Sequence, residues 1–287
     1  MGPIPKVLGI LGDPIGHTLS PLMHHTAAQY HTLEMVYLPF WVKPEQLPAA
    51  VQGIRGLGIV GVNITIPHKQ AVLPLVDEVT PEAQLIGALN TLHHVEGRLI
   101  GYNTDGPGFI ASLREDASEE PRGKRVVLLG AGGAARGLAI HLTLEGVAEL
   151  ILTNRTLERA QQLTSYVQSR LKQAPIRCLP WESRELEELL PQADILINST
   201  SVGMRPDDPP LFPYDRIRPH QLICDIVYRP LETPLLRQAR QQGARALDGL
   251  GMLIRQGALA FQIWTGREMP VGLVRQVLLE ALGVKTP

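Results

Sequence analysis

Short apolar runs alternate with longer amphipathic stretches along most of this chain. In the N-terminal part, the apolar runs predict strands at 7–11, 35–39 and 59–66. The amphipathic stretches predict helices at 21–30, 44–57 and 107–113. The first two helices are entered at proline, which is favoured at the first helical position. This alternation is typical of a parallel or mixed sheet covered by helices.

A second and more regular alternation begins near residue 125. Apolar runs predict strands at 126–129, 150–153, 176–179, 194–198 and 222–226, and helices are expected between them at 133–145, 156–172 and 232–242. Such a repeat predicts a doubly wound parallel sheet. Two amphipathic helices, at 253–264 and 271–282, are expected to follow.

The segment 114–124 is polar, contains Pro and Gly, and predicts a surface connection between two domains. We therefore expect an α/β chain with one domain at 1–112, a second at 113–248 and C-terminal helices at 249–287. A length of 287 residues suits two domains.

Composition narrows the class of protein. Hydrophobic residues make up 44% and charged residues 19%, and the formal net charge is -1, which argues against a nucleic-acid partner. The two cysteines, Cys178 and Cys224, match no zinc spacing and are too few for a disulfide framework. No apolar run is long enough for a signal peptide or a membrane span, so we expect a cytoplasmic protein.

The run Arg125–Leu129 leads directly into a glycine-rich turn and then into a helical pattern. Gly130, Gly132 and Ala135 fit the G-x-G-x-x-G/A fingerprint of a dinucleotide-binding turn. Free N–H groups at the start of such a helix face the pyrophosphate. The alternative is a glycine turn that serves packing alone.

The tip of the next predicted strand indicates which dinucleotide is bound. An NAD site usually has an acid there, whereas this chain has Asn154, Arg155 and Thr156, with Arg159 one turn later. A guanidinium binds a 2′-phosphate through charge-assisted hydrogen bonds, so this tip favours NADP. The alternative is that both arginines are solvated surface charges.

Two polar clusters in the N-terminal part are candidate substrate-binding residues. Thr18 and Ser20 precede a helix and could hold a small anion, although Ser20 also fits an ordinary N-cap. Asn63 and Thr65 interrupt a buried strand on one face, so each needs a partner or a ligand. Lys69 follows the end of that strand, and His68 beside it is either a second candidate acid or a surface side chain.

A third polar cluster contains Asn90, Asn103 and Asp105. All three are ordinary turn residues by default. Asp105 could also cap the helix expected at 107–113.

Taken together and in this order, these segments resemble the shikimate dehydrogenase family, which reduces 3-dehydroshikimate to shikimate with NADPH on the route to chorismate and the aromatic amino acids. The matching segments also include 87–91, 103–106, 198–204, 225–230 and 248–257. The resemblance implies an α/β substrate domain, a doubly wound Rossmann-type NADP domain, and a last helix that folds back onto the substrate domain.

The resemblance also implies roles for individual residues. Lys69 and Asp105 are the implied catalytic pair, and the implied substrate-binding residues are Thr18, Ser20, Thr65, Asn90, Tyr228 and Gln256. The expected NADP-binding residues are Gly130, Ala131, Gly132, Gly133, Ala134, Asn154, Arg155, Thr156, Arg159, Met204, Ile226, Gly249 and Met252. Thr18 stands where the family usually has Ser. No metal is required, because a lysine can stabilise the developing oxyanion.

Three other functions share parts of this pattern. A quinate/shikimate dehydrogenase would accept quinate and often NAD, and Asn154-Arg155-Thr156 argues against it. A catalytically silent NADP-binding sensor should lack Lys69 or Asp105, and both are present. A folate-type methylene dehydrogenase could share the layout, but paired hydroxyls and Asn90 suit a polyhydroxylated acid better. A monomer and a homodimer are both compatible with the sequence.

Overall fold

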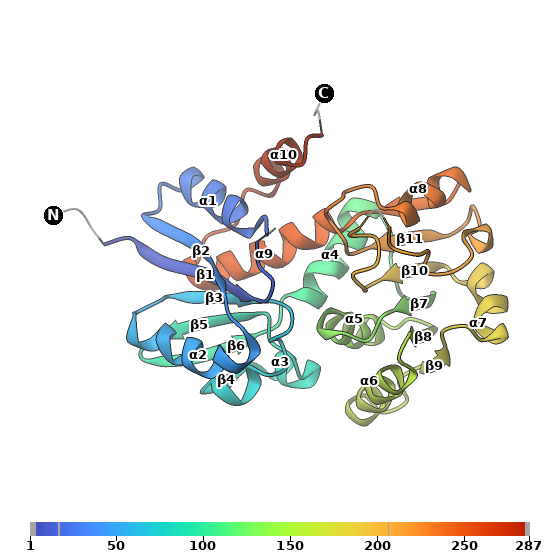
Figure 1. Ribbon diagram of the computed structural model, residues 1–287, viewed down its shortest axis with the longest axis horizontal. Coiled ribbons are helices and arrows are strands. Elements are labelled where there is room, and N and C mark those ends of the chain that lie inside the picture. Colours follow the sequence, from blue (N-terminus) through green and yellow to red (C-terminus); the bar gives the residue numbers. More distant parts are fainter. Residues whose placement is uncertain (1–3, 17, 206, 285–287) are drawn as a thin grey trace. The chain divides into compact units, whose positions relative to one another are not determined.

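The computed structural model describes residues 4–16, 18–205 and 207–284, and the chain divides into two compact units (Figure 1). Unit 1 comprises the described parts of Met1–Gly108 and Ile254–Pro287, and unit 2 comprises Phe109–Leu253. The expected α/β fold with two sheets is confirmed, as is the return of the C-terminal helices to the first unit. Within the described residues, no helix has the length and apolarity to cross a bilayer.

Unit 1 contains a mixed six-stranded sheet with the order β2-β1-β3-β5-β6-β4. Its strands are β1 (Lys6–Gly12), β2 (Met35–Trp41), β3 (Gly61–Ile64), β4 (Glu78–Val79), β5 (Thr91–Val95) and β6 (Arg98–Tyr102). Strand β1 pairs in parallel with β2 and β3, whereas β5 runs antiparallel to both β3 and β6. The parallel centre follows from strand–helix crossovers, and the antiparallel part follows from a tight hairpin.

The apolar pattern does not predict the β5–β6 hairpin, and the residues on either side of it have the composition of turns. Glu96 and Gly97 connect the two strands, and both have positive φ (49° and 80°). A two-residue turn of this kind matches the twist of the strands on either side. The pair Glu96-Gly97 between two β-type runs is therefore the sequence feature that could have predicted the hairpin.

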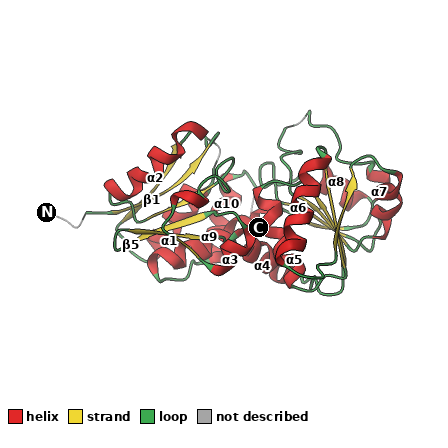
Figure 2. Cartoon of the chain, turned by 90° about the horizontal axis from the view of Figure 1, so that it is seen from below, coloured by secondary structure: helices red, strands yellow, loops and turns green. Residues whose placement is uncertain are grey.

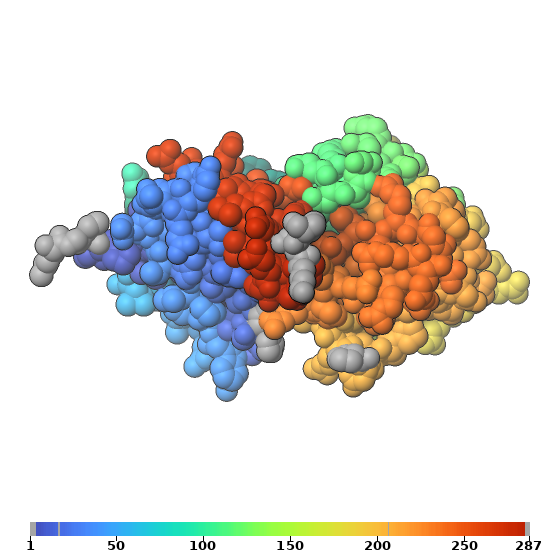
Figure 3. All heavy atoms as spheres, turned by 90° about the horizontal axis from the view of Figure 1, so that it is seen from above, coloured from blue at the N-terminus to red at the C-terminus, as the bar shows by residue number. Residues whose placement is uncertain are grey.

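Helices cover both faces of the unit 1 sheet. On one face, α2 (Leu47–Gly56) packs Val51 and Ile54 against Val62 and Ile64 of β3. The other helices are α1 (Ser20–Tyr30), α3 (Pro81–Ile86), α4 (Asp105–Ala117), α9 (Gly249–Thr265) and α10 (Val271–Ala281). Helix α4 begins in unit 1 and continues into unit 2, whereas α9 begins in unit 2 and continues into unit 1. Figure 3 shows α10 (red) beside α1 (blue), and these two helices are in contact.

Unit 2 contains an all-parallel six-stranded sheet with the order β12-β11-β10-β7-β8-β9. The strands are β7 (Arg125–Leu129), β8 (Glu149–Asn154), β9 (Ile176–Pro180), β10 (Ile195–Asn198), β11 (Leu222–Asp225) and β12 (Arg245–Leu247). The main helices are α5 (Gly133–Leu144), α6 (Leu157–Arg170), α7 (Arg184–Leu189) and α8 (Pro234–Gln241). In Figure 2, α5 and α6 lie on one side of the strands and α7 on the other, as expected for a doubly wound sheet.

Three local predictions were wrong. Ser20 is the first residue of α1 and not its cap, because Leu19 occupies the cap position and makes no side-chain hydrogen bond to the helix. Strand β3 ends at Ile64, so Thr65 lies beyond the strand that was expected to continue to residue 66. Helix α4 continues to Ala117, so the segment from Arg114 begins as helix and not as a loop.

Candidate active site

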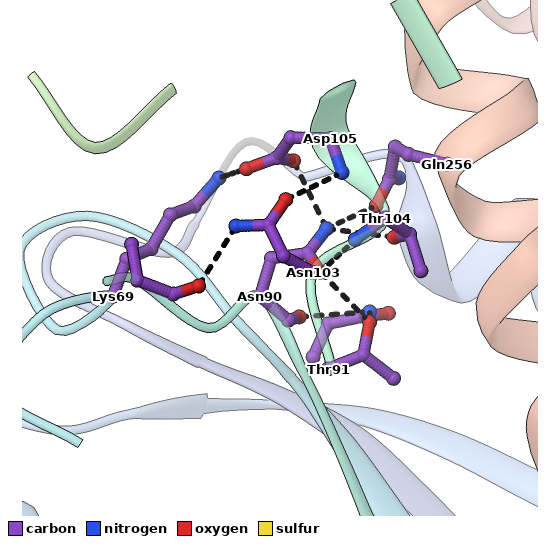
Figure 4. A network of polar contacts seen from close by, with 9 residues as sticks. Lys69, Asn90, Thr91, Asn103, Thr104, Asp105 and Gln256 are labelled. Atoms are coloured by element: carbon purple, nitrogen blue, oxygen red, sulfur yellow. Dashed lines mark hydrogen bonds and ion pairs between the residues drawn. The ribbon is translucent and has the colours of Figure 1, made fainter. Parts of the chain in front are cut away.

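Lys69 and Asp105 form an ion pair in unit 1, with 2.5 Å between Lys69 Nζ and Asp105 Oδ2 (Figure 4). Lys69 lies in the turns that follow β3, and Asp105 is the first residue of α4. The side chains are 13% and 5% exposed. Such a desolvated pair keeps its two charges in a fixed geometry, and each charge stabilises the other.

Asn90 holds the other carboxylate oxygen of Asp105. Its Nδ2 donates to Asp105 Oδ1 (2.9 Å), to Thr104 Oγ1 (2.8 Å) and, more weakly, to Gln256 Oε1 (3.3 Å). Its Oδ1 accepts from the Thr104 backbone N–H at 2.7 Å. The amide therefore has one possible orientation, because the backbone N–H can only donate. Figure 4 shows Lys69, Asn90, Asp105 and Gln256 gathered at this point.

Asn103 shapes the turn that carries Asp105. Its Oδ1 accepts from the Asp105 backbone N–H at 3.1 Å, and its Nδ2 donates to the Ala88 carbonyl at 2.9 Å. Asn103 thus has the turn-forming role expected from the sequence. Asn90 does not, since it links three segments of the chain.

Thr18 and Ser20 form a second polar group within unit 1. Thr18 Oγ1 donates to Ser20 Oγ at 3.1 Å, and the Ser20 N–H donates back to Thr18 Oγ1 at 3.2 Å. Ser20 is buried and Thr18 is half-buried. Because Ser20 does not cap α1, its hydroxyl is available for other partners. The neighbouring residue 17 lies outside the described residues.

Thr65 and His68 lie on the chain between β3 and Lys69. Thr65 is half-buried, and its backbone N–H donates to the Leu11 carbonyl at 2.9 Å. His68 is only 1% exposed, and its Nε2 lies 2.6 Å from the Val42 carbonyl. His68 is therefore buried against the backbone, so the suggestion of a surface side chain was wrong.

The glycine-rich turn of unit 2 has the geometry of a phosphate-binding turn. Gly130 has φ of +113°, and a Cβ there would lie 2.7 Å from Ser199 Oγ, so only glycine fits. Gly132 precedes α5, no side chain caps this helix, and a Cβ at Gly132 would meet nothing within 4 Å. Ala135 is fully buried between helix and sheet. The first N–H groups of α5 lack intrahelical acceptors, so the turn fits a pyrophosphate.

Two positively charged side chains follow the end of β8. Asn154 Nδ2 donates to the Thr156 carbonyl at 2.8 Å, which tightens the turn into α6. Arg155 and Arg159 are both exposed. Within the described part of the chain, neither side chain forms an ion pair. These arginines and this turn fit a 2′-phosphate.

Further predicted residues also lie in unit 2. Gly249, at the start of α9, donates its N–H to the Val227 carbonyl at 3.2 Å, and a Cβ at Gly249 would lie 2.3 Å from the Ile226 carbonyl oxygen. Gly249 and Ile226 are therefore in close contact. Met252 is buried, Met204 is exposed and Tyr228 is half-buried.

Asp225 is a buried acid that sequence reasoning did not assign to the site. It accepts from Asn198 Nδ2 (2.9 Å), Thr233 Oγ1 (2.8 Å) and the Val227 N–H (3.0 Å). Burial raises the pKa of Asp225 to about 6, although these hydrogen bonds oppose the shift. Asp225 therefore joins the loops after β10 and β11, on which Met204, Ile226 and Tyr228 lie. An acid at the end of an apolar strand must have polar partners, and this feature of the sequence could have identified Asp225.

Comparisons with known proteins agree on one family over most of the chain. Residues 10–92 match the shikimate dehydrogenase substrate binding domain, residues 112–204 match the shikimate/quinate 5-dehydrogenase family, and residues 249–279 match the shikimate 5′-dehydrogenase C-terminal domain. The shikimate dehydrogenase (NADP(+)) of Methanopyrus kandleri is 45% identical over 279 residues, which cover 96% of each chain.

Solved structures that share this fold include enzymes that act on shikimate and on quinate. Shikimate 5-dehydrogenase from Thermus thermophilus, in complex with NADP(H) and shikimate, has a TM-score of 0.86 at 37% identity and covers 96% of this chain and 99% of its own. Quinate dehydrogenase from Corynebacterium glutamicum, in complex with NAD, has a TM-score of 0.88 at 32% identity and covers 96% of this chain and 99% of its own.

Proposed function

The chain belongs to the shikimate dehydrogenase family, and we propose that it reduces 3-dehydroshikimate reversibly to shikimate with NADPH. The observation that supports this proposal is the Lys69–Asp105 ion pair, with the Asn90 amide bound to the same carboxylate. A cation held in this way can stabilise the oxyanion that forms in the reduction of a ketone.

The substrate is bound by side chains of unit 1 under this proposal. The carboxylate of the acid accepts hydrogen bonds from Thr18 and Ser20, whose oxygens lie 3.1 Å apart. The ring hydroxyls bind Thr65, Asn90 and Gln256. Tyr228, in unit 2, is the remaining proposed substrate contact. Such an uncharged set favours a polyhydroxylated acid, because each hydroxyl that is missing from the ligand leaves a protein donor or acceptor unpaired.

Lys69 performs the proton chemistry under this proposal. As the carbonyl carbon is reduced, negative charge grows on its oxygen, and Lys69 Nζ donates first a hydrogen bond and then a proton to that oxygen. Asp105 keeps Lys69 in position through the 2.5 Å contact, and Asn90 keeps Asp105 in position. Lysine then regains its proton from water.

The cofactor is bound by unit 2, and NADPH supplies the hydride when it is bound. The turn Gly130–Ala134 holds the pyrophosphate at the N-terminus of α5. Asn154, Arg155, Thr156 and Arg159 hold the 2′-phosphate, and Met204, Ile226, Gly249 and Met252 contact the nicotinamide. We also propose that the protein works in the cytoplasm, as a monomer or a homodimer.

One absorbance assay at the NADPH band tests this function. Shikimate and quinate are each supplied with NADP⁺ and with NAD⁺. Turnover of shikimate with NADP⁺ and little turnover in the other three combinations is the expected result. Preference for quinate or NAD⁺ would instead support a quinate/shikimate dehydrogenase, and no turnover in any combination would support the silent sensor.

A further inference from the structure

The end of strand β1 packs against the segment that carries Thr65. The Thr65 backbone N–H donates to the Leu11 carbonyl at 2.9 Å. The Asp13 N–H donates to the Ile66 carbonyl, also at 2.9 Å. Gly12, between Leu11 and Asp13, is buried and is the last residue of β1. The backbone of Thr65 is therefore held in place beside Gly12.

The missing side chain of Gly12 leaves room for the methyl group of Thr65. A Cβ at Gly12 would lie 2.4 Å from Thr65 Cγ2, well inside the ~3.5–4.0 Å at which two carbon atoms make contact. It would also lie 3.0 Å from Ile15 Cδ1 and 3.3 Å from the Ile66 carbonyl oxygen. Gly12 does not have the left-handed backbone conformation that favours glycine. Lack of space, and not backbone conformation, therefore makes glycine the residue that fits.

The position of the Thr65 methyl group determines the direction of the Thr65 hydroxyl, because both groups are bonded to Cβ. A threonine side chain occupies one of a few staggered rotamers. With the methyl group over Gly12, one rotamer remains and the hydroxyl has one direction. Among the residues that the structure describes, no hydrogen bond holds this hydroxyl. Packing against Gly12 is thus what orients it.

A Cβ added at residue 12 would displace its two neighbours in different ways. Ile15 Cδ1 is the end of a flexible side chain and can move aside by rotation. Thr65 Cγ2 is one bond from Cβ, and the Thr65 backbone is held by Leu11. The methyl group therefore moves only by rotation about χ1 to another staggered rotamer, which turns the hydroxyl by about 120°.

We propose that Gly12 is a positioning residue that directs the Thr65 hydroxyl toward the ring hydroxyls of the substrate. This inference rests on the proposed function, in which Thr65 binds one of these hydroxyls. Recognition of the ring then depends on a residue that has no side chain, and the sizes of residues 12 and 65 have to match.

Gly12→Ala tests this role. The variant should raise KM for shikimate by ~2- to 10-fold, which corresponds to the loss of one neutral hydrogen bond. Its kcat should change by less than about 2-fold, because the contact between Lys69 and Asp105 is kept. Gly53→Ala in α2 is the matched control, since a Cβ there would meet nothing within 4 Å, and both constants should stay at their wild-type values. An unchanged KM in Gly12→Ala would overturn the proposal.

A second substitution distinguishes positioning of the hydroxyl from a general loss of fit. Gly12→Ala/Thr65→Ser keeps the hydroxyl and removes the methyl group that meets the new Cβ, so its KM should be at least ~2-fold below that of Gly12→Ala. In Gly12→Ala/Thr65→Ala no hydroxyl is left to direct, so KM should equal that of Thr65→Ala alone. No improvement with serine, or a further rise in KM when Gly12→Ala is added to Thr65→Ala, would overturn the proposal.

A wild-type enzyme that does not turn over shikimate would contradict the proposed function instead. The packing is then judged by free energies of unfolding, which also apply if Gly12→Ala is too unstable to assay. Gly12→Ala should lower the free energy of unfolding, and Gly12→Ala/Thr65→Ser should recover most of that loss. Losses for Gly12→Ala and Thr65→Ser that simply add would show that the Thr65 methyl group does not occupy the space at Gly12, and would overturn the inference.

Discussion

The two units bring their functional groups to a ligand in opposite ways. In unit 1, Asn90 and Asp105 are buried, Lys69 is part-buried, and the three candidate side chains are bonded to one another. In unit 2, the turn at Gly132 and the side chain of Arg155 are exposed. Unit 1 thus contains a network of polar side chains bonded to one another, whereas unit 2 presents exposed backbone N–H groups and exposed charges.

The difference follows from what each unit would recognise. A small polyhydroxylated acid has few atoms, so its recognition depends on hydrogen-bond donors and acceptors that the protein holds in fixed positions. Each of these groups stays unpaired when a ligand lacks the matching hydroxyl. A dinucleotide offers phosphates, which helix N-termini and arginines bind through charge. Changes in unit 1 should therefore be the more damaging, because they break buried contacts.

Removal of the unit 1 cation should have the largest effect. Lys69→Ala should lower kcat by ~10²- to 10⁴-fold, the usual contribution of a general acid–base group, whereas KM changes much less. The exposed Lys43 serves as the control, and Lys43→Ala should leave both constants unchanged. A steep rise in KM with kcat preserved would show that Lys69 only binds substrate.

Buried His24 in unit 1 should make the protein sensitive to acid. Burial, helped by the nearby His25, lowers the pKa of His24 from 6.5 to about 3, although Asn63 opposes the shift. The unfolded chain then binds a proton below pH 6.5 that the folded protein excludes, so stability falls as pH falls. By pH ~4, His24 should therefore lower the free energy of unfolding by about 3 kcal/mol relative to its value at neutral pH.

His24→Phe keeps an aromatic ring against Tyr37 and removes the titrating group. Unfolding by denaturant at several pH values between about 4 and 8 measures the difference from wild type. The wild type should lose stability relative to the variant as pH falls. A constant difference across this range would contradict the lowered pKa.

Asp225 in unit 2 should have the opposite pH dependence. Its folded pKa is raised from 3.8 to about 6, chiefly by burial, so the folded protein keeps a proton that the unfolded chain releases. Stability from this group is therefore lost as pH rises from about 4 to about 6, by roughly 2 kcal/mol. In the same unfolding measurement, the free energy of unfolding of Asp225→Asn should therefore rise relative to that of the wild type over that interval. A variant whose free energy of unfolding falls relative to that of the wild type as pH rises would show that the pKa of Asp225 is not raised.

Changes at the exposed arginines should have the smallest and most selective effect. A hydrogen bond to a charged group contributes roughly 1.5–3 kcal/mol, so Arg155→Ala should weaken NADP by ~10- to 100-fold and leave NAD almost unchanged. Dissociation constants from calorimetry measure both. Arg184→Ala, at a side chain that is 91% exposed, is the control. Equal losses for NADP and NAD would show that Arg155 does not contact the 2′-phosphate.

Unit 2 could be predicted closely from the sequence. Strands β7 to β11 and helices α5, α6 and α8 lie where the apolar pattern indicated, although α7 and β12 were not predicted. The conformation of Gly130 and the burial of Ala135 match the motif. These features depend on short stretches of chain. A turn that needs a positive φ requires glycine wherever the rest of the protein lies.

The site in unit 1 could be predicted only as separate clusters. Its members come from four places: the turns after β3, the segment before β5, the start of α4, and α9. The β5–β6 hairpin, which the apolar pattern did not predict, separates the segment before β5 from the start of α4. Resemblance to a family pointed to Lys69, Asn90, Asp105 and Gln256. The residues themselves did not distinguish Asn90 from an ordinary turn residue, nor did they identify Thr104 as a hydrogen-bond partner of its side chain.

The sequence by itself determined the fold class, the order of most elements, the nucleotide turn and the charge at its strand tip, because each depends on neighbouring residues. Only the tertiary structure decided that His68 is buried against Val42, that Ser20 is not a helix cap, and that Asn90 is hydrogen-bonded to the carboxylate of Asp105. The physical reason is that a buried polar side chain must find its partners wherever the folded chain brings them. That location depends on the path of the whole chain and not on local pattern.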